Sequence, residues 1–391
     1  MGEFERNIMQ NVFVVGVGMT IFGKHTERSL RDLGREACLN ALRDAGISPK
    51  EIEAGYCGNA LAPAIQGETG VGQNVFWEVG INEIPIVNTE NACASGSTAL
   101  REGWMAIAGG FYDVVIVAGV EKTVMPKGAM LDVGAAELET KLGDVFPGQF
   151  ALIAQKHMER YGTTREQLAK VSVKNHFNGT LNPYAQFQKL FTVEEVLNSP
   201  MVADPLTLFS CCPNSDGAAA LILCSQKKAR KMKARAVRVA ASILTSGTYN
   251  NQRDITGWEI ENRAAEGAYQ KASLGPKDID IVEVHDAFTI SEIIHYEDLG
   301  LCAPGEGGRL IDEGATELGG RVPVNPSGGL LSRGHPVGAS GVAQVVEIVW
   351  HLRGEAGKRQ VKDARVGLAQ IMGGYKEWDT RACTVHILMK D

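Results

Sequence analysis

Three side chains of this sequence could act together as a nucleophile and its acid-base partners. Cys93 lies between an apolar extended run and a stretch of small residues that is typical of a helix start, and His285 and His335 follow much later in the chain. Exposed backbone N–H groups at a helix start favour a thiolate, so we expect a lowered pKa for Cys93. An imidazole could take the thiol proton, and the sulfur could then attack an acyl carbonyl to form a thioester.

Glycine-rich phrases accompany these residues. His335 lies in Gly334-His335-Pro336-Val337-Gly338, and Gly373-Gly374 follows an apolar strand. Glycine lets a substrate approach the backbone, whose N–H groups could stabilise an oxyanion by ~3 kcal/mol each. Each feature alone is more often structural, because a buried cysteine usually behaves as a small hydrophobe. Together they favour a catalytic site.

Composition limits the class of protein. The chain has 391 residues, 44% of them hydrophobic, enough for a large core and two domain-sized units. Its net charge of -7 and the lack of a basic stripe argue against a nucleic-acid surface. We expect a soluble cytoplasmic protein, because no signal or membrane-spanning stretch is evident. The eight cysteines lack metal-ligand spacing, so we expect reduced thiols and no metal site.

Repeated phrases indicate an internal duplication. A turn containing Pro49 and the strand after it resemble the segment that begins at Pro276. Ala-Ser-Gly begins an expected helix at 94–109 and another at 339–354, at one constant offset. By the same offset Cys93 aligns with Gly338. His335 therefore precedes the position equivalent to the nucleophile, and the two loops could meet across a pseudo-twofold axis.

Strands alternate with helices in both parts of the chain, which predicts parallel sheets covered by helices, twice over. A more polar region between the two parts reads as an insertion. We therefore predict an α/β protein with two related halves. The first half comprises residues 1–121 and 215–232, the insertion 122–214, and the second half 233–391.

Four phrases point to a known family: Asn91-Ala92-Cys93-Ala94-Ser95-Gly96, His285-Asp286-Ala287-Phe288, Asn325-Pro326-Ser327-Gly328-Gly329 and Gly334-His335-Pro336-Val337-Gly338-Ala339-Ser340-Gly341. They resemble the phrases of thiolases, and the resemblance runs from Val14 to Leu388. His-Asp ahead of Ala-Phe is similar to the sterol-carrier-protein and archaeal types.

The resemblance implies the thiolase fold, in which two duplicated α/β halves form five αβαβα layers with an inserted loop domain. It also implies a homodimer that uses coenzyme A as a substrate and has no permanently bound cofactor. Archaeal-type thiolases work with a small partner that contains a zinc ribbon and an OB-fold. Zinc is therefore expected only in that partner subunit.

The resemblance also implies roles for individual residues. Cys93 would be the acylated nucleophile, and His335 its activator and an oxyanion donor. His285 would be a second donor to the thioester oxygen, and Asp286 would orient it.

Further roles concern the oxyanion and the substrate pocket. The backbone N–H groups of Cys93 and of Gly373 or Gly374 would form a second oxyanion hole. Ala287, Phe288 and Met372 would line the substrate pocket.

Two positions depart from the thiolase pattern. Thiolases carry a second cysteine as acid and base, but this chain has Ala287 and Met372 at the two places where it occurs. Neither side chain transfers a proton. Cleavage needs only protonation of a resonance-stabilised enolate, so the substitutions favour degradative thiolysis. Ala287 would also widen the pocket for a bulky or branched 3-oxoacyl-CoA.

The substrate expectation comes from resemblance alone. This chain resembles the thiolases of anaerobic toluene degradation, which cleave 2-benzoylsuccinyl-CoA to benzoyl-CoA and succinyl-CoA. An alternative is a biosynthetic acetoacetyl-CoA thiolase of the archaeal type, whose mark would be a cysteine at position 287. A second alternative is a non-catalytic scaffold subunit, which would not need Cys93 and both histidines.

Overall fold

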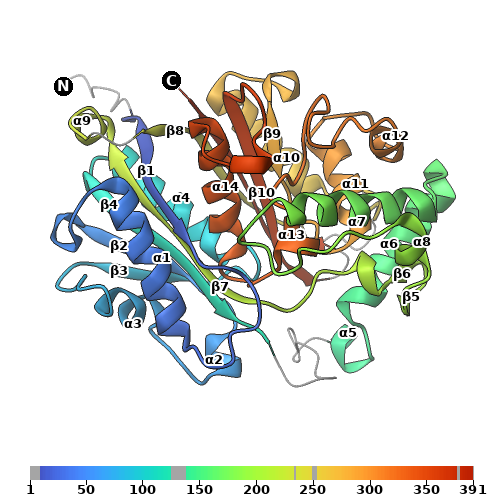
Figure 1. The fold of residues 1–391 in the computed structure, drawn as a ribbon, viewed down its shortest axis with the longest axis horizontal. Coiled ribbons are helices and arrows are strands. Elements are labelled where there is room, and N and C mark those ends of the chain that lie inside the picture. Colours follow the sequence, from blue (N-terminus) through green and yellow to red (C-terminus); the bar gives the residue numbers. More distant parts are fainter. Residues whose placement is uncertain (1–8, 125–137, 233–234, 249–252, 377–378, 391) are drawn as a thin grey trace.

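The computed structural model describes residues 9–124, 138–232, 235–248, 253–376 and 379–390. Its central feature is a nine-stranded sheet (Figure 1). In spatial order the strands are β3 (Ile86–Thr89), β2 (Ala54–Gly58), β4 (Val114–Lys122), β7 (Asp216–Ser225), β1 (Val12–Met19), β8 (Val237–Ser246), β11 (Asp379–Met389), β10 (Val366–Lys376) and β9 (Ile281–Glu283).

The sheet consists of two similar halves joined at β1 and β8. These two strands pair through only two residue pairs, Phe13 with Arg238 and Val14 with Val237. Outward from this joint, β7, β4 and β2 on one side correspond to β11, β10 and β9 on the other. A bridge from Val282 to Val324 lies where β2 pairs with β3 in the first half. The expected duplication is therefore visible in the order of the strands.

The expectation of parallel sheets is wrong in part, because both half-sheets are mixed. β2 is parallel to β3 and β4, and β9 is parallel to β10. However, β7 and β11 run antiparallel to both of their neighbours. β10 and β11 are adjacent in the chain, and so short a connection can join only antiparallel strands.

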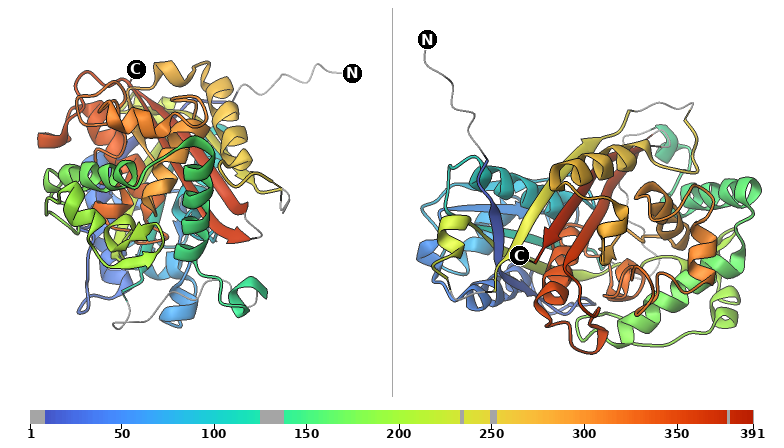
Figure 2. Two further views of the ribbon diagram at one scale, coloured as in Figure 1. Left: turned by 90° about the vertical axis from the view of Figure 1, so that its right-hand side faces the viewer. Right: turned by 90° about the horizontal axis from the view of Figure 1, so that it is seen from above.

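Helices cover the outer faces of the half-sheets and fill the space between them. α1 (Leu30–Ala45) and α3 (Val71–Trp77) pack on the outer face of the first half, and α10 (Glu259–Ala272) and α11 (Thr289–Asp298) on that of the second. α4 (Ser95–Ala108) and α14 (Ser340–Arg353) lie between, in one apolar cluster with residues from both half-sheets. This is the expected five-layer order, which Figure 2 shows from two further sides.

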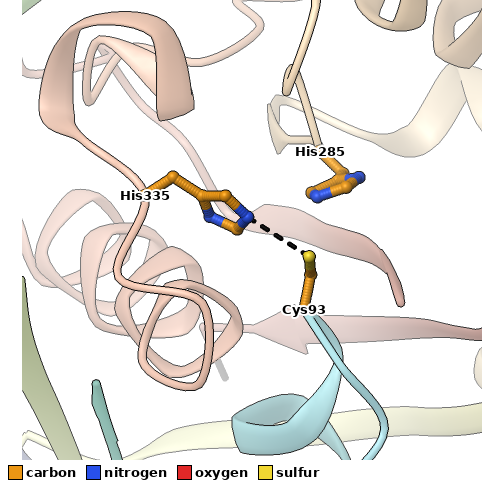
Figure 3. Close-up of side chains that lie close together, drawn as sticks. All are labelled: Cys93, His285 and His335. Atoms are coloured by element: carbon orange, nitrogen blue, oxygen red, sulfur yellow. Dashed lines mark hydrogen bonds between the residues drawn. The ribbon is translucent and has the colours of Figure 1, made fainter. Parts of the chain in front are cut away.

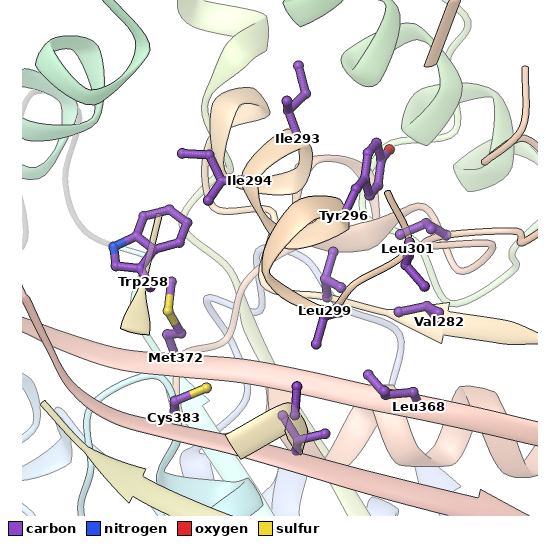
Figure 4. Packing of buried hydrophobic residues seen from close by; sticks show 14 of the residues in the cluster. Trp258, Val282, Ile293, Ile294, Tyr296, Leu299, Leu301, Leu368, Met372 and Cys383 are labelled. Atoms are coloured by element: carbon purple, nitrogen blue, oxygen red, sulfur yellow. The ribbon is translucent and has the colours of Figure 1, made fainter. Parts of the chain in front are cut away.

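Strand periodicity explains the layers. Val115 and Val117 of β4 belong to the central cluster, whereas Ile116 and Ala118 belong to the outer one. Successive side chains of a strand point to opposite faces, so an entirely apolar strand predicts burial on both sides. A further apolar cluster joins α11 to the β10–β11 pair, and Trp258 and Met372 belong to it (Figure 4).

A helical segment between β4 and β7 packs against the second half. α6 (Phe146–Tyr161) and α7 (Arg165–Thr180) contact α11, and α7 also contacts α13 (Gly329–Arg333). Thr164 begins α7 with a capping box, as its sequence predicts. The boundaries proposed above for the halves and the insertion stay a prediction.

The remaining elements are short. They are α2 (Ala62–Ile65), α5 (Leu138–Lys141), α8 (Val193–Leu197), β5 (Met201–Ala203), β6 (Leu206–Thr207), α9 (Gln226–Ala229), α12 (Gly307–Asp312) and four 3-10 turns, at Pro49–Glu51, Leu208–Ser210, Pro276–Asp278 and Gly357–Arg359. Two of the 3-10 turns begin at Pro49 and Pro276, the prolines of the repeated phrase. None of the described helices combines the length and apolar character that crossing a bilayer requires.

Candidate active site

Cys93 lies in a tight turn just before α4. Its predecessor Ala92 has a φ of 47°, a left-handed conformation that is unusual for a residue with a side chain. The Ser95 hydroxyl stabilises this turn, because it donates to the Ala92 carbonyl at 2.6 Å and accepts from the Asn91 N–H at 2.9 Å. The expected position at a helix start is therefore confirmed, and the turn directs the sulfur away from the helix.

His335 comes from the other half and reaches the sulfur. Its Nε2 lies 3.3 Å from Cys93 Sγ, and its Nδ1 lies 2.8 Å from the Ser340 hydroxyl. That hydroxyl also lies 3.0 Å from the Pro336 carbonyl, which can only accept, and a hydroxyl that donates its proton there accepts from Nδ1–H. The proton on Nδ1 leaves Nε2 with a lone pair, and the imidazole is oriented to take the proton of the Cys93 thiol.

His285 completes a group of three side chains that point toward one another from three separate segments (Figure 3). The ring centroids of His285 and His335 are 5.4 Å apart. The backbone of His285 is held on both sides, since its N–H donates to the Gln370 side chain and its carbonyl accepts from His295. Within the described residues, neither ring nitrogen of the buried His285 has a hydrogen-bond partner.

Sequence reasoning missed the residues that position His285. His295 lies on α11, the helix that follows the His-Asp phrase. Its Nε2 bonds to the His285 carbonyl, and its Nδ1 is 2.7 Å from Glu261 of α10. A buried polar stripe on an otherwise apolar helix is the signal that could have identified them. Gln370 lies inside the apolar strand β10 and offers the same kind of signal.

Asp286 does not orient His285, so that expectation is wrong. Its carboxylate accepts the backbone N–H groups of Leu330 at 2.6 Å and Leu331 at 3.2 Å, and the side-chain amide of Asn175 at 2.7 Å. The backbone makes a tight turn at His285, where the Asp286 N–H donates to the Val284 carbonyl at 3.1 Å, and the Asp286 carboxylate is taken up by these three donors rather than by the His285 ring. Asp286 instead anchors α13 and α7 to the histidine loop.

The environment of Asp286 is strongly polar and fully buried. Burial and the nearby Glu292 carboxylate raise the pKa of Asp286 well above its ordinary value. Lys174 lies 2.8 Å from Glu292 and supplies one positive charge to the pair. This network is a rigid base for the loop that carries His285.

The glycine pair on β10 approaches the nucleophile closely. A Cβ atom on Gly373 would collide with the Asn91 carbonyl oxygen, so only glycine fits there. Gly374 has a φ of 69°, and its backbone N–H faces the Cys93 sulfur together with the N–H of Cys93 itself. Of the two glycines expected to donate, the geometry therefore favours Gly374, and Gly373 provides the close approach.

The expected low pKa of Cys93 is wrong for the resting site. Burial and then the Glu121 carboxylate raise the pKa of Cys93 to about 12, against the lowering by the Gly374 and Cys93 N–H groups. Burial, and then Arg333, lower the pKa of His335 to about 3. The pair is therefore a neutral thiol beside a neutral imidazole. Proton transfer must accompany attack on the substrate, as in general-base catalysis.

Glu121 is a further residue that sequence reasoning missed. This carboxylate lies at the end of β4 and accepts hydrogen bonds from Asn59 Nδ2 and from the backbone N–H groups of Ala60, Leu61 and Gly338. Burial raises the pKa of Glu121 to about 7 despite these bonds. Glu121 thus ties the His335 loop to the first half and places negative charge near the nucleophile. An acidic residue at the end of an apolar strand was the available signal.

The three expected pocket residues are all buried. Phe288 stacks on Phe150 of α6 with ring centroids 4.4 Å apart. Ala287 accepts the backbone N–H of Cys212 at 2.9 Å. Met372 belongs to the apolar cluster that also contains Trp258 (Figure 4). A methyl and a thioether therefore occupy the two positions at which the sequence pattern leads us to expect an acid.

Comparison with known proteins places this geometry in a family. Residues 12–227 match the family model "Thiolase, N-terminal domain", and residues 241–388 match "Thiolase C-terminal domain-like". The chain is 48% identical over 371 residues to an acetyl-CoA acetyltransferase of Methanothermobacter thermautotrophicus. The match covers 94% of this chain and 97% of that relative.

Two further proteins are similar along nearly their whole length. The benzoylsuccinyl-CoA thiolase subunit BbsB of Thauera aromatica is 40% identical over 372 residues, with 93% of this chain and 95% of that relative covered. Among solved structures, the Ltp2-ChsH2(DUF35) aldolase superposes with a TM-score of 0.84 at 26% identity, covering 98% of this chain and 99% of that chain.

Proposed function

This chain belongs to the thiolase family and is an acyl-CoA C-acyltransferase, and on that premise we propose that it works degradatively, cleaving a bulky or branched 3-oxoacyl-CoA with coenzyme A. The contact between Cys93 and His335 across the two halves, at 3.3 Å, is the observation that carries the acyl-cysteine chemistry. Alanine at 287 and methionine at 372 support the cleaving direction, because neither can remove a proton from an acyl-CoA α-carbon.

In the first half-reaction the Cys93 sulfur attacks the 3-oxo carbon while its proton passes to His335 Nε2. The oxyanion is stabilised by the backbone N–H groups of Cys93 and Gly374, each contributing ~3 kcal/mol. The bond between C2 and C3 then breaks, which leaves an acyl group on Cys93 and the enolate of a departing acyl-CoA. His285 donates to the enolate oxygen, and the proton held by His335 passes to the carbon, directly or through a water molecule, which leaves His335 neutral again.

In the second half-reaction coenzyme A attacks the acyl-cysteine. His335 takes the proton of the incoming thiol, the same backbone donors stabilise the second oxyanion, and Cys93 leaves as a thiolate that is protonated again. The reaction consumes one coenzyme A and releases two thioesters. No resident cofactor takes part in this proposal.

We propose 2-benzoylsuccinyl-CoA as the substrate, cleaved to benzoyl-CoA and succinyl-CoA in anaerobic toluene degradation. The 40% identity to BbsB supports this choice. The test is steady-state thiolysis of a panel that contains 2-benzoylsuccinyl-CoA, straight-chain 3-oxoacyl-CoA esters and acetoacetyl-CoA. A kcat/KM highest for the aryl ester would support the proposal, and a kcat/KM highest for acetoacetyl-CoA would reject it.

A second candidate is acetoacetyl-CoA thiolase activity of the archaeal type, which the 48% identity to an acetyl-CoA acetyltransferase favours. The two candidates differ in their demand for a base. An enzyme that condenses acetyl-CoA exchanges its α-protons with deuterated water. Rapid exchange would support the second candidate, and its absence, together with thiolysis, would support the first.

We propose that the chain acts in the cytoplasm as a homodimer with a small zinc-ribbon and OB-fold subunit. The similarity to the Ltp2-ChsH2(DUF35) aldolase, whose name joins two proteins, supports a partner of this kind. Co-purification from the native host should recover a small zinc protein that raises activity. Full thiolysis by the isolated homodimer would reject the requirement for it. A scaffold role would instead leave every activity of the complex intact in Cys93→Ser.

A further inference from the structure

The three side chains of the site also form a set of soft metal ligands. Among the described residues, Cys93 Sγ and one nitrogen each of His285 and His335 all lie within 4.8 Å of one another. They come from three separate segments and converge on a common point (Figure 3). A thiolate and two imidazoles are the ligand types that Zn²⁺ prefers.

The nitrogen lone pairs needed for a metal are available. Ser340 holds the proton of His335 on Nδ1, which leaves the Nε2 lone pair directed at the sulfur. His285 has no hydrogen-bond partner within the described residues at either ring nitrogen, although its side chain is buried. A buried polar group normally has a partner, so an unpartnered imidazole beside a thiol and a second imidazole points to a ligand.

From these contacts we propose that Cys93, His285 and His335 form a binding site for Zn²⁺ that reversibly inhibits the enzyme. With Zn–S near 2.3 Å and Zn–N near 2.0 Å, a tetrahedral ion separates its sulfur and nitrogen ligands by about 3.5 Å. The distance between Cys93 and His335 is 3.3 Å. This pair is already near the required distance, and the His285 nitrogen, within 4.8 Å of both other ligand atoms, would have to approach by about 1.5 Å or less.

The surroundings of the ligands resemble those that stabilise zinc sites. Ser340 orients His335 through the nitrogen that would not bind the metal, and Gln370 and His295 hold the backbone of His285. Three protein ligands leave one tetrahedral position for water or a substrate thiol. Binding replaces the Cys93 S–H bond with an S–Zn bond and releases one proton to the buffer. Neither oxidant nor reductant is involved.

Inhibition follows from the identity of the ligands. The ion would occupy the sulfur electron pair that attacks the substrate and the lone pair of His335 that accepts the proton. Only this inhibitory consequence rests on the proposed function, because metal binding depends on the geometry of the three ligands alone. The two are therefore tested by separate measurements.

Cobalt is a suitable probe, because Co²⁺ occupies tetrahedral zinc sites and reports its ligands optically. Titration of the purified full-length chain with Co²⁺ should produce the visible bands of tetrahedral cobalt and a near-ultraviolet thiolate-to-cobalt band. Both should saturate at one equivalent of Co²⁺. Cys93→Ser should abolish the thiolate band. His285→Ala should weaken binding by about 100-fold or more, the loss typical of disturbed metal sites.

Cys302→Ser is the matched control, since Cys302 is a half-buried thiol outside the cluster, and this variant should keep every band. Zn²⁺ should displace Co²⁺ and inhibit thiolysis, and EDTA should restore it. A thiolate band that persists in Cys93→Ser, or no stoichiometric binding by the wild-type chain, would overturn the metal site. If Co²⁺ binds as expected but Cys93 is never acylated, the metal site stands and the proposed thiolysis fails.

Discussion

The starts of α4 and α14 occupy equivalent places in the two halves, and they divide one catalytic task between them. Both helices begin with Ser-Gly after an alanine, and both serines donate their hydroxyl proton to a carbonyl of the preceding turn. In the first half Ser95 accepts from the backbone N–H of Asn91, which shapes the nucleophile turn. In the second half Ser340 accepts from the ring of His335.

The residue two places before each helix differs for a physical reason. At Cys93 the side chain extends toward His335 and His285, while Gly373, which lacks a Cβ, lets β10 pass close to the turn. At the equivalent Gly338, a Cβ atom would lie 2.9 Å from the Cα of Asn59 and 3.0 Å from the Val120 carbonyl oxygen. The second loop is thus pressed against the first half, and this contact carries His335 to the sulfur. The duplicated scaffold provides both parts of the pair, and close packing decides which part each loop provides.

The largest effect is expected where the two helix starts differ most. Cys93→Ser replaces the thiol by a weaker nucleophile of similar size, so kcat/KM for thiolysis should fall by about 10⁴-fold or more. Intact mass measured after addition of a 3-oxoacyl-CoA should show an acyl adduct on the wild-type chain and none on the variant. Cys302→Ser serves as the control. An equally acylated Cys93→Ser chain would show that the nucleophile lies elsewhere.

A smaller effect is expected from the serines that the two helix starts share. Ser340→Ala frees the His335 ring to place its proton on either nitrogen, and kcat should fall by about 100-fold, within the range of general-base contributions. Ser95→Ala removes an equivalent hydroxyl that touches no catalytic ring. It should cost about 1 to 3 kcal/mol of unfolding free energy and reduce kcat less. Equal losses of kcat in the two variants would argue against a role of Ser340 in fixing the tautomer.

Glu121 ties the loop before α14 to the first half, and its charge is expected to hold Cys93 as a thiol. Glu121→Gln keeps the size but removes the negative charge, so the pKa of Cys93 should fall and iodoacetamide should alkylate it about tenfold faster at pH 8, as a shift of one pKa unit would give. Mass spectrometry of the Cys93 peptide measures this rate. Unchanged alkylation would mean that burial alone sets the pKa.

Stability should depend on pH through the same carboxyl group. Because the pKa of Glu121 is raised from 4.5 to about 7, the folded chain binds more protons than the unfolded chain between these values. The free energy of unfolding should therefore fall as pH rises from 5 to 8, with Glu121 contributing on the order of 3 kcal/mol. Urea unfolding at several pH values measures it. Glu121→Gln should show a flatter profile, and an identical slope in the variant would contradict this origin.

Much of the fold could be predicted from local signals. Local signals define the helix Leu30–Ala45, because apolar residues recur at helical spacing and Gly46 ends it in a left-handed conformation. The helices 94–109 and 339–354 were found within one residue at each end. The antiparallel direction of β7 and β11 could not be predicted, since strand pairing depends on partners that periodicity does not identify.

The candidate site divides in a similar way. Cys93, His285 and His335 were identified from residue type and setting, and the structure brings all three together. Their catalytic roles stay a prediction. Ser340 was part of a recognised phrase, but its bond to His335 was not foreseen. Glu121, His295 and Gln370 were missed, because a buried polar residue far from the motif carries no local mark of what it contacts.

By itself the sequence determined which chemical groups this protein has available: a thiol at a helix start, two histidines in special loops, and no second cysteine at the two expected positions. Only the tertiary structure decided their protonation and orientation. The high pKa of Cys93 depends on burial and on Glu121, the tautomer of His335 depends on Ser340, and the Asp286 carboxylate bonds to Leu330 rather than to its neighbour. These properties follow from distances through space between the halves, and local patterns along the chain do not encode them.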